Sequence, residues 1–204
     1  MAIRGLIFDY GGVLWDMRWD ITRTLEQEHG LRERALVETL YGSETWRQLE
    51  IGVGDRDVWL TEAHRDLEAV VGRELPPLHR HWRERQHLIA PNIDVIRRLR
   101  PKYKTSVLSN ADNTLIDRLR NVGVADLFDD IVCSADVGMA KPEPRLYALA
   151  AERLGLPATE CVFVDDLERN IDAAREAGMH SVHFRVDQGH VLEDQLAELG
   201  VRVG

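Results

Sequence analysis

Strand-like and helix-like segments alternate along the second half of the chain, and this alternation constrains the fold more than any other feature. The strand-like runs span residues 104–110, 129–136, 161–166 and 180–186, and the helix-like segments span residues 92–101, 113–123, 142–155, 168–178 and 191–200. A further apolar run, Leu6 to Phe8, is too short to be a helix. Such alternation predicts an α/β fold in which helices cover both faces of a mostly parallel sheet.

Residues 15–90 have a different pattern. They contain helix-like segments that end at glycines, and none of these segments resembles a strand. We therefore expect an α/β core formed by residues 1–14 and 91–204, with a helical domain, residues 15–90, inserted after the first strand. The tryptophans of the helical domain are interpreted mainly as packing residues; they are Trp19, Trp46, Trp59 and Trp82.

Composition excludes several classes of protein. Hydrophobic residues make up 44% of the 204 residues, which is enough for a folded core. The net charge of −9 argues against binding to nucleic acid or to an acidic membrane surface. No apolar run is long enough to span a membrane and no signal peptide is recognisable, so we expect a cytoplasmic protein. Cys133 and Cys161 lie in apolar runs and are interpreted as small buried side chains rather than as a disulfide.

Polar residues stand where the predicted strands end. Ligands of parallel α/β sheets bind beyond the carboxyl ends of the strands, so these residues should meet at one edge. Neighbouring carboxylates repel one another unless a cation neutralises them, and an all-oxygen ligand set suits Mg²⁺. A lysine would balance the charge of a phosphate, and a serine with nearby backbone amides would hold its oxygens. In chain order the residues are Asp9, Ser109, Asn110, Lys141, Asp165 and Asp166.

Each of these residues also has a purely structural interpretation. Ser109 and Asn110 could begin a turn, Asp165 and Asp166 could cap the following helix, and a lone lysine is usually a solvated charge. Their joint position at the strand ends favours a site. The basic stretch of residues 79–104 is interpreted as a solvated face or as a means of steering an anionic substrate.

Four motifs, in order, resemble those of the haloacid dehalogenase-like (HAD) hydrolase superfamily. The segments FDYGGVL, LSN, GMAKPEP and FVDDLERNIDAAREAG are similar to its four motifs, and residues 15–90 resemble the helical C1 cap of subfamily I. The resemblance implies a Rossmann-like core with the strand order 3-2-1-4-5. That order would separate Cys133 from Cys161 by roughly 14 Å at ~4.8 Å per strand, which is too far for a disulfide.

The resemblance also implies roles for the residues at the strand ends. Asp9 matches the aspartate that attacks phosphorus and forms an aspartyl-phosphate, which water then hydrolyses. Ser109 matches a residue that binds phosphate oxygens, with Asn110 beside it. Lys141 matches the lysine that steadies the nucleophile and the transferring group.

The expected cofactor is Mg²⁺. The resemblance implies that it is held by Asp9, by the backbone carbonyl of Gly11, and by one or both of Asp165 and Asp166, with Asp166 favoured as the direct ligand. Gly11 and Gly12 are also expected to contribute backbone groups that bind phosphate.

Gly11 departs from the pattern of most family phosphatases. They carry a second aspartate at this position, which protonates the leaving group and later activates water. Such acid–base assistance is worth roughly 10²–10⁴-fold. The Asp-x-Gly pattern also resembles that of a subgroup of bacterial sugar phosphatases, so it is compatible with ester hydrolysis. Asp16 and Glu50 are candidates to replace the missing acid, and Glu50 and Asp55 are candidates to touch substrate from a cap loop, unless that loop is only a helix–helix turn.

Three functions remain open. The leading hypothesis is a Mg²⁺-dependent phosphatase of a small phosphorylated metabolite, similar to a sugar phosphate. A haloacid dehalogenase also lacks the second acid but needs no metal, whereas Asp165, Asp166 and Lys141 favour metal and phosphate. A non-enzymatic relative that uses the fold for binding is disfavoured by the intact Asp9 and Lys141.

Overall fold

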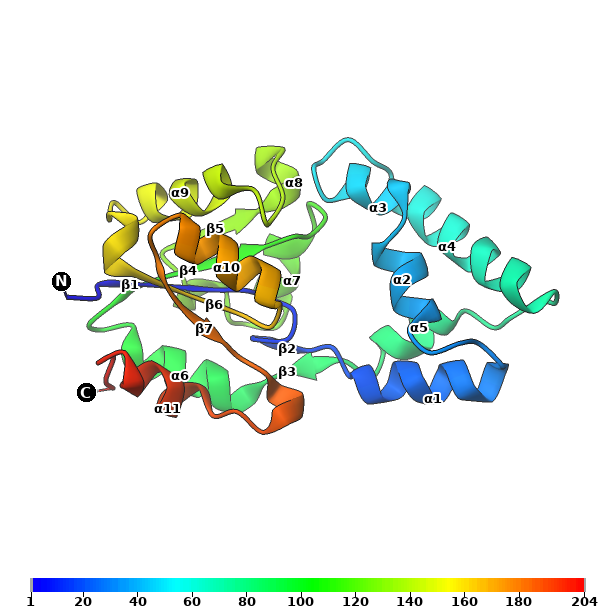
Figure 1. The fold of residues 1–204 in the computed structure, drawn as a ribbon, viewed down its shortest axis with the longest axis horizontal. Helices are drawn as coiled ribbons and strands as arrows, with labels where there is room; N and C mark the ends of the chain where they lie inside the picture. Colours follow the sequence, from blue (N-terminus) through cyan, green and yellow to red (C-terminus); the bar gives the residue numbers. More distant parts are fainter. Residues whose placement is uncertain (1, 204) are drawn as a thin grey trace.

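The computed structural model describes residues 2–203 and consists of two lobes (Figure 1). The larger lobe contains a five-stranded sheet whose strands all pair in parallel. The strands are β1 (Gly5–Phe8), β4 (Lys104–Ser109), β5 (Asp130–Cys133), β6 (Cys161–Asp165) and β7 (His180–His183). Their order in the sheet, β5-β4-β1-β6-β7, is the predicted 3-2-1-4-5 order when the core strands are counted along the chain. The predicted α/β fold is therefore confirmed.

Helices cover both faces of this sheet, as the alternation of segments predicts (Figure 1). In β1, Leu6 and Phe8 point to one face and Ile7 to the other, and all three side chains are fully buried. The helices on the first face are α6 (Ala90–Leu99), α7 (Leu115–Asn121) and α11 (Leu192–Glu198). The second face packs against α9 (Pro144–Arg153) and α10 (Glu168–Glu176), and the short α8 (Ser134–Val137) follows β5.

The smaller lobe is helical and has its own apolar core. Its helices are α1 (Trp19–His29), α2 (Ala35–Tyr41), α3 (Glu44–Leu49), α4 (Arg56–Val71) and α5 (Leu78–Arg83). Trp46, Trp59 and Trp82 are buried in that core and Trp19 packs against it, so the interpretation of these residues as packing residues holds. Helix α5 was not expected, because its six residues follow two prolines that read as a break in the sequence. We call this lobe the cap.

A short two-stranded sheet joins the lobes, and the sequence did not indicate it. Strand β2 (Trp15–Asp16) pairs antiparallel with β3 (His87–Leu88). Two residues are too few to show a strand period, and the partners lie far apart in the chain. The pairing holds the two chain crossings between core and cap side by side (Figure 1).

Two predicted strands are shorter than expected, because residues 134–136 of the run 129–136 belong to α8 and the run 180–186 ends as a strand at His183. Cys133 and Cys161 are buried and free, and they belong to strands separated in the sheet by β4 and β1. Single turns of 3-10 helix occupy Ala125–Leu127, Ala158–Glu160 and Val186–Gln188. Within residues 2–203, no helix combines the length and apolar character needed to cross a membrane.

Candidate active site

Asp9 stands at the point where the strand order of the sheet reverses. Phe8, the last residue of β1, pairs with Val107 of β4 on one side and with Val164 of β6 on the other. The Asp9 amide then donates to the Val164 carbonyl at 2.8 Å, which sets Asp9 beside Asp165 at the end of β6. In open parallel sheets, ligands bind in the crevice beyond the carboxyl ends of the strands, at the point where the strand order reverses.

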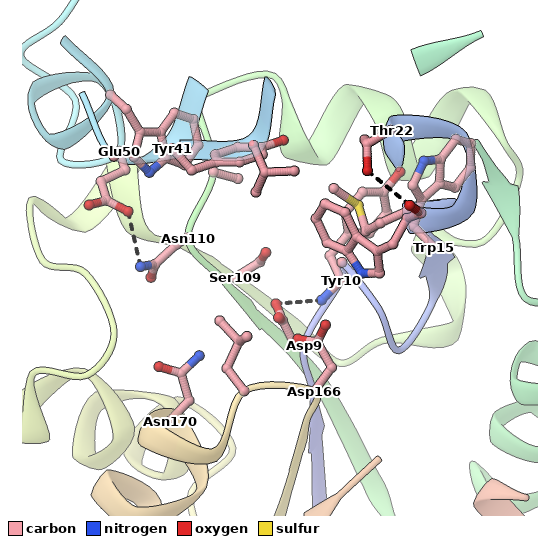
Figure 2. Close-up of a pocket in the computed structure, with 18 of the residues that line it drawn as sticks. Asp9, Tyr10, Trp15, Thr22, Tyr41, Glu50, Ser109, Asn110, Asp166 and Asn170 are labelled. Atoms are coloured by element: carbon pink, nitrogen blue, oxygen red, sulfur yellow. Dashed lines mark hydrogen bonds between the residues drawn. The ribbon is translucent and has the colours of Figure 1, made fainter. Parts of the chain in front are cut away.

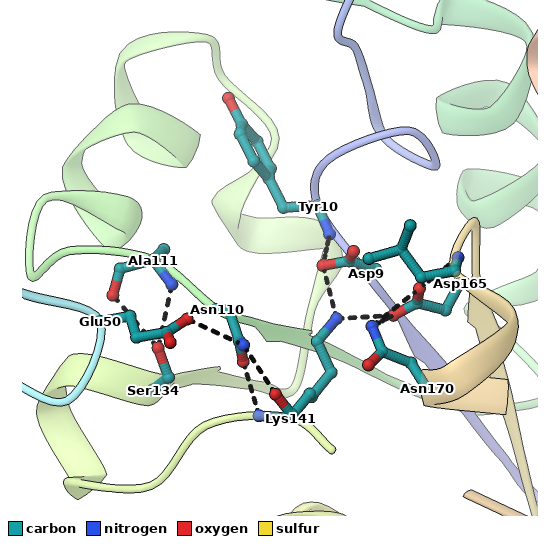
Figure 3. A network of polar contacts seen from close by, with 10 residues as sticks. Asp9, Tyr10, Glu50, Asn110, Ala111, Ser134, Lys141, Asp165 and Asn170 are labelled. Carbon is teal, nitrogen blue, oxygen red and sulfur yellow. Dashed lines mark hydrogen bonds and ion pairs between the residues drawn. The ribbon is translucent and has the colours of Figure 1, made fainter. Parts of the chain in front are cut away.

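Lys141 lies between two of the predicted acids (Figure 3). Its Nζ atom is 2.9 Å from Asp9 Oδ1 and 2.6 Å from Asp165 Oδ2, and only 2% of its side chain is exposed. Burial by itself would lower the pKa of Lys141, but the charges of Asp165 and Asp9 outweigh burial and raise it. Lys141 is therefore a fixed positive charge directly behind the Asp9 carboxylate.

Asp165 is engaged by protein groups on both of its carboxylate oxygens. Besides Lys141, it accepts hydrogen bonds from the Leu167 amide at 2.8 Å and from Asn170 Nδ2 at 3.1 and 3.0 Å. Its side chain is fully buried. Asp165 is therefore better suited to anchoring Lys141 than to binding a metal directly. This leaves Asp166 as the favoured metal ligand.

Asp166 is half-buried, and within residues 2–203 its carboxylate accepts no hydrogen bond from another side chain. Burial, followed by the negative charges of Asp9 and Asp165, raises the pKa of Asp166 to about 8. Burial also raises the pKa of Asp9 to about 6, although Lys141 opposes the shift. Ionising Asp9 and Asp166 at the same time therefore costs free energy unless a cation is bound next to them.

The acids form a group that fits a hard cation. One carboxylate oxygen each from Asp9, Asp165 and Asp166 lies within 4.8 Å of the other two. The ligand atoms are all oxygens, and a bound divalent cation would offset the repulsion that raises the pKa of Asp9 and Asp166. The residues present therefore fit Mg²⁺.

The two glycines after Asp9 have different structural roles. The loop closes tightly, because the Tyr10 carbonyl accepts from the Leu14 and Trp15 amides at 3.0 and 2.8 Å. Gly12 has φ of 76°, and a Cβ atom built on it would lie 2.3 Å from Asp166 Oδ2. Gly11 lies outside the left-handed region, and its Cβ would meet only the flexible Met17 side chain, at 3.4 Å. Glycine is required at position 12 but not, on steric grounds, at position 11.

Asn110 and Ser109 complete the core side of the site. Asn110 Oδ1 accepts from the Lys141 amide at 2.7 Å, and its Nδ2 donates to the Lys141 carbonyl and to Glu50 Oε2, both at 3.0 Å (Figure 3). Asn110 thus holds the Lys141 loop and links it to the cap. Ser109 lines the cavity, and its hydroxyl is close enough to Asp9 to oppose the rise in the pKa of that acid.

A cavity of about 1180 Å³ separates the strand ends from the cap (Figure 2). Glu50, which follows α3, faces the same space as Asp9 and Ser109. Burial raises the pKa of Glu50 from its ordinary value, while Asn110 opposes the rise. The cap side also contributes aromatic rings to the lining, from Trp15, Trp19, Tyr41, Trp46 and Trp59.

Two of the candidates from the sequence do not line this cavity. Asp55 is exposed and caps α4, where its Oδ1 accepts from the Asp57 and Val58 amides at 2.8 and 3.0 Å. Asp16 lies in β2, and its Oδ1 accepts from the Arg18 amide at 2.8 Å. Of the two residues named as candidates to touch substrate, Asp55 does not line the cavity and instead fills a local capping role. Asp16 also does not line the cavity, so it is no longer a candidate to replace the missing acid.

Several cavity residues were not singled out from the sequence. Asn170 stands five residues after Asp165, and that spacing places it one turn into α10, where it reaches back to the acid. That signal was available in the sequence. Arg83 and Arg118 also line the cavity. They come from different lobes, and nothing in the sequence pairs them.

The fold and the strand-end acids define the class of protein. A sequence model of the family described as haloacid dehalogenase-like hydrolase matches residues 3–178. That match covers most of the chain, and the chain belongs to this family of hydrolases. The predicted resemblance is confirmed.

Individual relatives and solved structures are consistent with this assignment. The chain is 27% identical over 191 residues to fructose-1-phosphate phosphatase YqaB of Escherichia coli, with 89% of the chain and 96% of the relative covered. It is 28% identical over 188 residues to the sesquiterpene phosphatase astK of Aspergillus oryzae, with 90% of each covered. A HAD family enzyme from Bacteroides thetaiotaomicron, solved in complex with magnesium and inorganic phosphate, matches with a TM-score of 0.65 at 23% identity, covering 89% of this chain and 93% of the other.

Proposed function

We propose that this chain is a Mg²⁺-dependent phosphatase of a small phosphorylated metabolite and that it acts through an aspartyl-phosphate on Asp9. The observation that carries the proposal is the position of Asp9. Its carboxylate sits at the strand-order reversal, 2.9 Å from Lys141 and facing the cavity between core and cap. The names of the relatives, which include a fructose-1-phosphate phosphatase, support a phosphate ester as substrate.

The first chemical step forms one bond and breaks another. Asp9 Oδ1 is held by the Tyr10 amide at 2.7 Å and by Lys141, so Oδ2 is the oxygen that attacks phosphorus. The bond from phosphorus to the ester oxygen breaks, and the alcohol leaves with a proton. Water then attacks the phosphorus, which regenerates the Asp9 carboxylate and releases inorganic phosphate.

Glu50 is the group we assign to proton transfer. With Gly11 in place of the usual acid, the proton for the leaving oxygen has to come from elsewhere. Glu50 faces the cavity, and its raised pKa keeps part of it protonated closer to neutral pH than an exposed glutamate. After the first step the same carboxylate can accept a proton from the attacking water.

Asp9, Asp166 and the Gly11 carbonyl are the groups assigned to hold Mg²⁺. The bound ion would supply positive charge that offsets the charge of the transferring phosphoryl group. Lys141 would add a second positive charge next to Asp9, and Asp165 with Asn170 keeps Lys141 in place.

A screen of phosphorylated metabolites tests the proposal. We expect hydrolysis of at least one ester class with Mg²⁺, loss of that hydrolysis in EDTA, and recovery when Mg²⁺ is restored. A haloacid dehalogenase also lacks the aspartate that most family phosphatases carry at position 11. We therefore include 2-haloacids in the same screen. Halide release that persists in EDTA, with no phosphate release from any ester, would replace the phosphatase proposal with the dehalogenase one.

A further inference from the structure

Three arginines meet near one wall of the cavity, where the core and the cap face each other. Arg56 begins α4, Arg83 ends α5 and Arg118 lies on α7, and all three are half-buried. Arg56 and Arg118 share one carboxylate, that of Asp112. Its Oδ2 is 3.6 Å from Arg56 Nε and its Oδ1 is 3.4 Å from Arg118 Nη2.

Arg83 is the arginine whose charge is least compensated. Between residues 2 and 203, no hydrogen bond or ion pair holds its guanidinium, although it lines the cavity. Burial lowers the pKa of Arg83, and the positive charge of Arg56 lowers it further. The Nε atoms of Arg56 and Arg118 are also buried without a hydrogen-bond partner. The group therefore has spare donors as well as spare charge.

Three other arginines around the cavity are neutralised by carboxylates of the protein itself. Arg34 lies 3.6 Å from Glu38, Arg47 lies 2.9 Å from Glu44, and Arg185 lies 2.6 Å from Asp187; these three arginines line the same cavity. Arg23 and Arg169 also line the cavity without an ion pair among the described residues, but both are exposed to solvent, so the partly desolvated excess of positive charge lies on the Arg83 side. An excess of this kind, desolvated and next to a substrate cavity, fits an anionic group of the ligand.

We propose that Arg83 and Arg118 bind a second anionic group of the substrate, a carboxylate or a second phosphate, located on the part of the ester that leaves. The inference rests on the proposed phosphatase function and narrows its substrate class. Guanidinium groups suit this role because their planar set of donors matches the oxygens of carboxylates and phosphates.

Tyr10 connects Arg118 to the nucleophile. Its Cζ atom lies 5.5 Å from the centre of the Tyr10 ring, and the Tyr10 amide donates to Asp9. Tyr10 thus contacts the nucleophile through its amide and Arg118 through its ring, so one residue links the two ends of the proposed substrate site. Arg83 belongs to the cap and Arg118 to the core, so such an anion would also hold the two lobes together.

Paired esters that differ in one charge test this inference. The probes are 3- and 4-carboxyphenyl phosphate against the corresponding neutral carbamoylphenyl phosphates, and 3-phosphoglycerate against glycerol 3-phosphate. For at least one pair we expect wild type to prefer the charged member by about tenfold or more in kcat/KM, mainly through KM. The preference should shrink as salt is raised, because added ions screen the attraction.

Variants at neighbouring arginines identify the group responsible. Arg83→Gln should reduce the preference for charged esters to near unity, and Arg83→Lys should keep part of it. Arg85→Gln is the matched control, because Arg85 is exposed two residues away and does not line the cavity. Thermal melting of each variant separates a loss of fold from a loss of charge.

The outcomes separate this inference from the function on which it rests. If the neutral esters are hydrolysed in a Mg²⁺-dependent way but charged esters gain nothing, or if Arg83→Gln keeps the full preference, the second-anion site is wrong and the phosphatase proposal stands. If no ester of either kind is hydrolysed, the proposed function fails, and the inference fails with it.

Discussion

The two walls of the cavity are built in different ways. The core wall consists of residues at or beyond the carboxyl ends of the strands, and contacts between their side chains fix them: Lys141 contacts Asp9 and Asp165, and Asn170 contacts Asp165. The cap wall consists of side chains from several helices. There Arg83 has no bonded partner among the described residues, and Glu50 reaches the core through one hydrogen bond, to Asn110.

This difference predicts that the core wall and the cap wall contribute differently to the hydrolysis of different esters. A rigid, prearranged wall can act in the same way on every ester, since the phosphoryl group is common to all of them. A wall made of side chains with free donors and aromatic surface can distinguish one leaving group from another. Changes in the core wall should therefore affect all esters alike, and changes in the cap wall should affect them selectively.

The largest effect is expected from Asp9→Asn. The substitution keeps the shape of the side chain and removes the attacking charge, so turnover of aryl and alkyl phosphates should fall together, by roughly 10³-fold or more. Steady-state rates on both ester classes measure it. Asp172→Asn, an exposed change on α10, is the control. Activity near wild type in Asp9→Asn would remove Asp9 from the mechanism.

Glu50→Gln should act selectively. Alkyl phosphates leave as strongly basic alkoxides and need a proton, so their kcat should fall by roughly 10²-fold. Aryl phosphates leave as weakly basic phenolates and should lose much less. The control is Glu28→Gln on α1, an exposed residue that does not line the cavity. Equal losses for both ester classes would show that Glu50 does not transfer the proton.

A second substitution sharpens the test of Glu50. Gly11 has no positive φ, and only the Met17 side chain lies near its missing Cβ, so an aspartate can be introduced there. In the Glu50→Gln background, Gly11→Asp should restore part of the alkyl-phosphate activity, because it returns an acid to the position where most family phosphatases carry one. Failure of this rescue in a folded double variant would show that the site cannot use an acid at position 11.

The two glycines of the core wall should differ in their effect on stability. Gly12→Ala places a Cβ in the left-handed region and against Asp166, so it should lower the free energy of unfolding by about 1–2 kcal/mol or more. Gly11→Ala meets neither obstacle and should change stability far less. Urea denaturation of both variants measures the difference. Equal destabilisation would mean that the loop constrains both positions.

The smallest effect concerns stability as a function of pH. Burial raises the pKa of Asp9 to about 6 and that of Asp166 to about 8, both above the ordinary value of 3.8. The folded state therefore binds protons more tightly than the unfolded state, and the metal-free protein should lose stability as pH rises from about 4 to about 8. Mg²⁺ competes with these protons, so its stabilising effect should be larger, by roughly a few degrees in Tm, at pH 8 than at pH 5.

Thermal melts with and without Mg²⁺ across this pH range measure the effect. Asp166→Asn removes one of the two acids and should flatten the pH dependence of the metal-free protein. A metal-free protein whose stability rises steadily through this range would contradict the account of the acid cluster.

The sequence by itself predicted the parallel sheet and the residues at the ends of its strands, and the resemblance to the hydrolase family supplied the order of the strands. Strand periods, helix periods and turn glycines are local signals, and a parallel sheet brings the ends of its strands to one edge whatever the details of packing. Asp9, Ser109, Lys141 and Asp166 could therefore be named before any coordinates, and the structure places all four around one cavity.

Only the tertiary structure decided which of these residues are free to act and what faces them. The resemblance favoured Asp166 over Asp165 as the metal ligand, and the structure gives a physical reason: buried hydrogen bonds from Lys141 and Asn170 occupy Asp165 and leave Asp166 open. Asp55 was a candidate substrate contact and is a helix cap, while Arg83 was one charge in a basic stretch of the sequence and lines the cavity. These roles depend on contacts between segments far apart in the chain, and such contacts exist only after the cap has packed against the core.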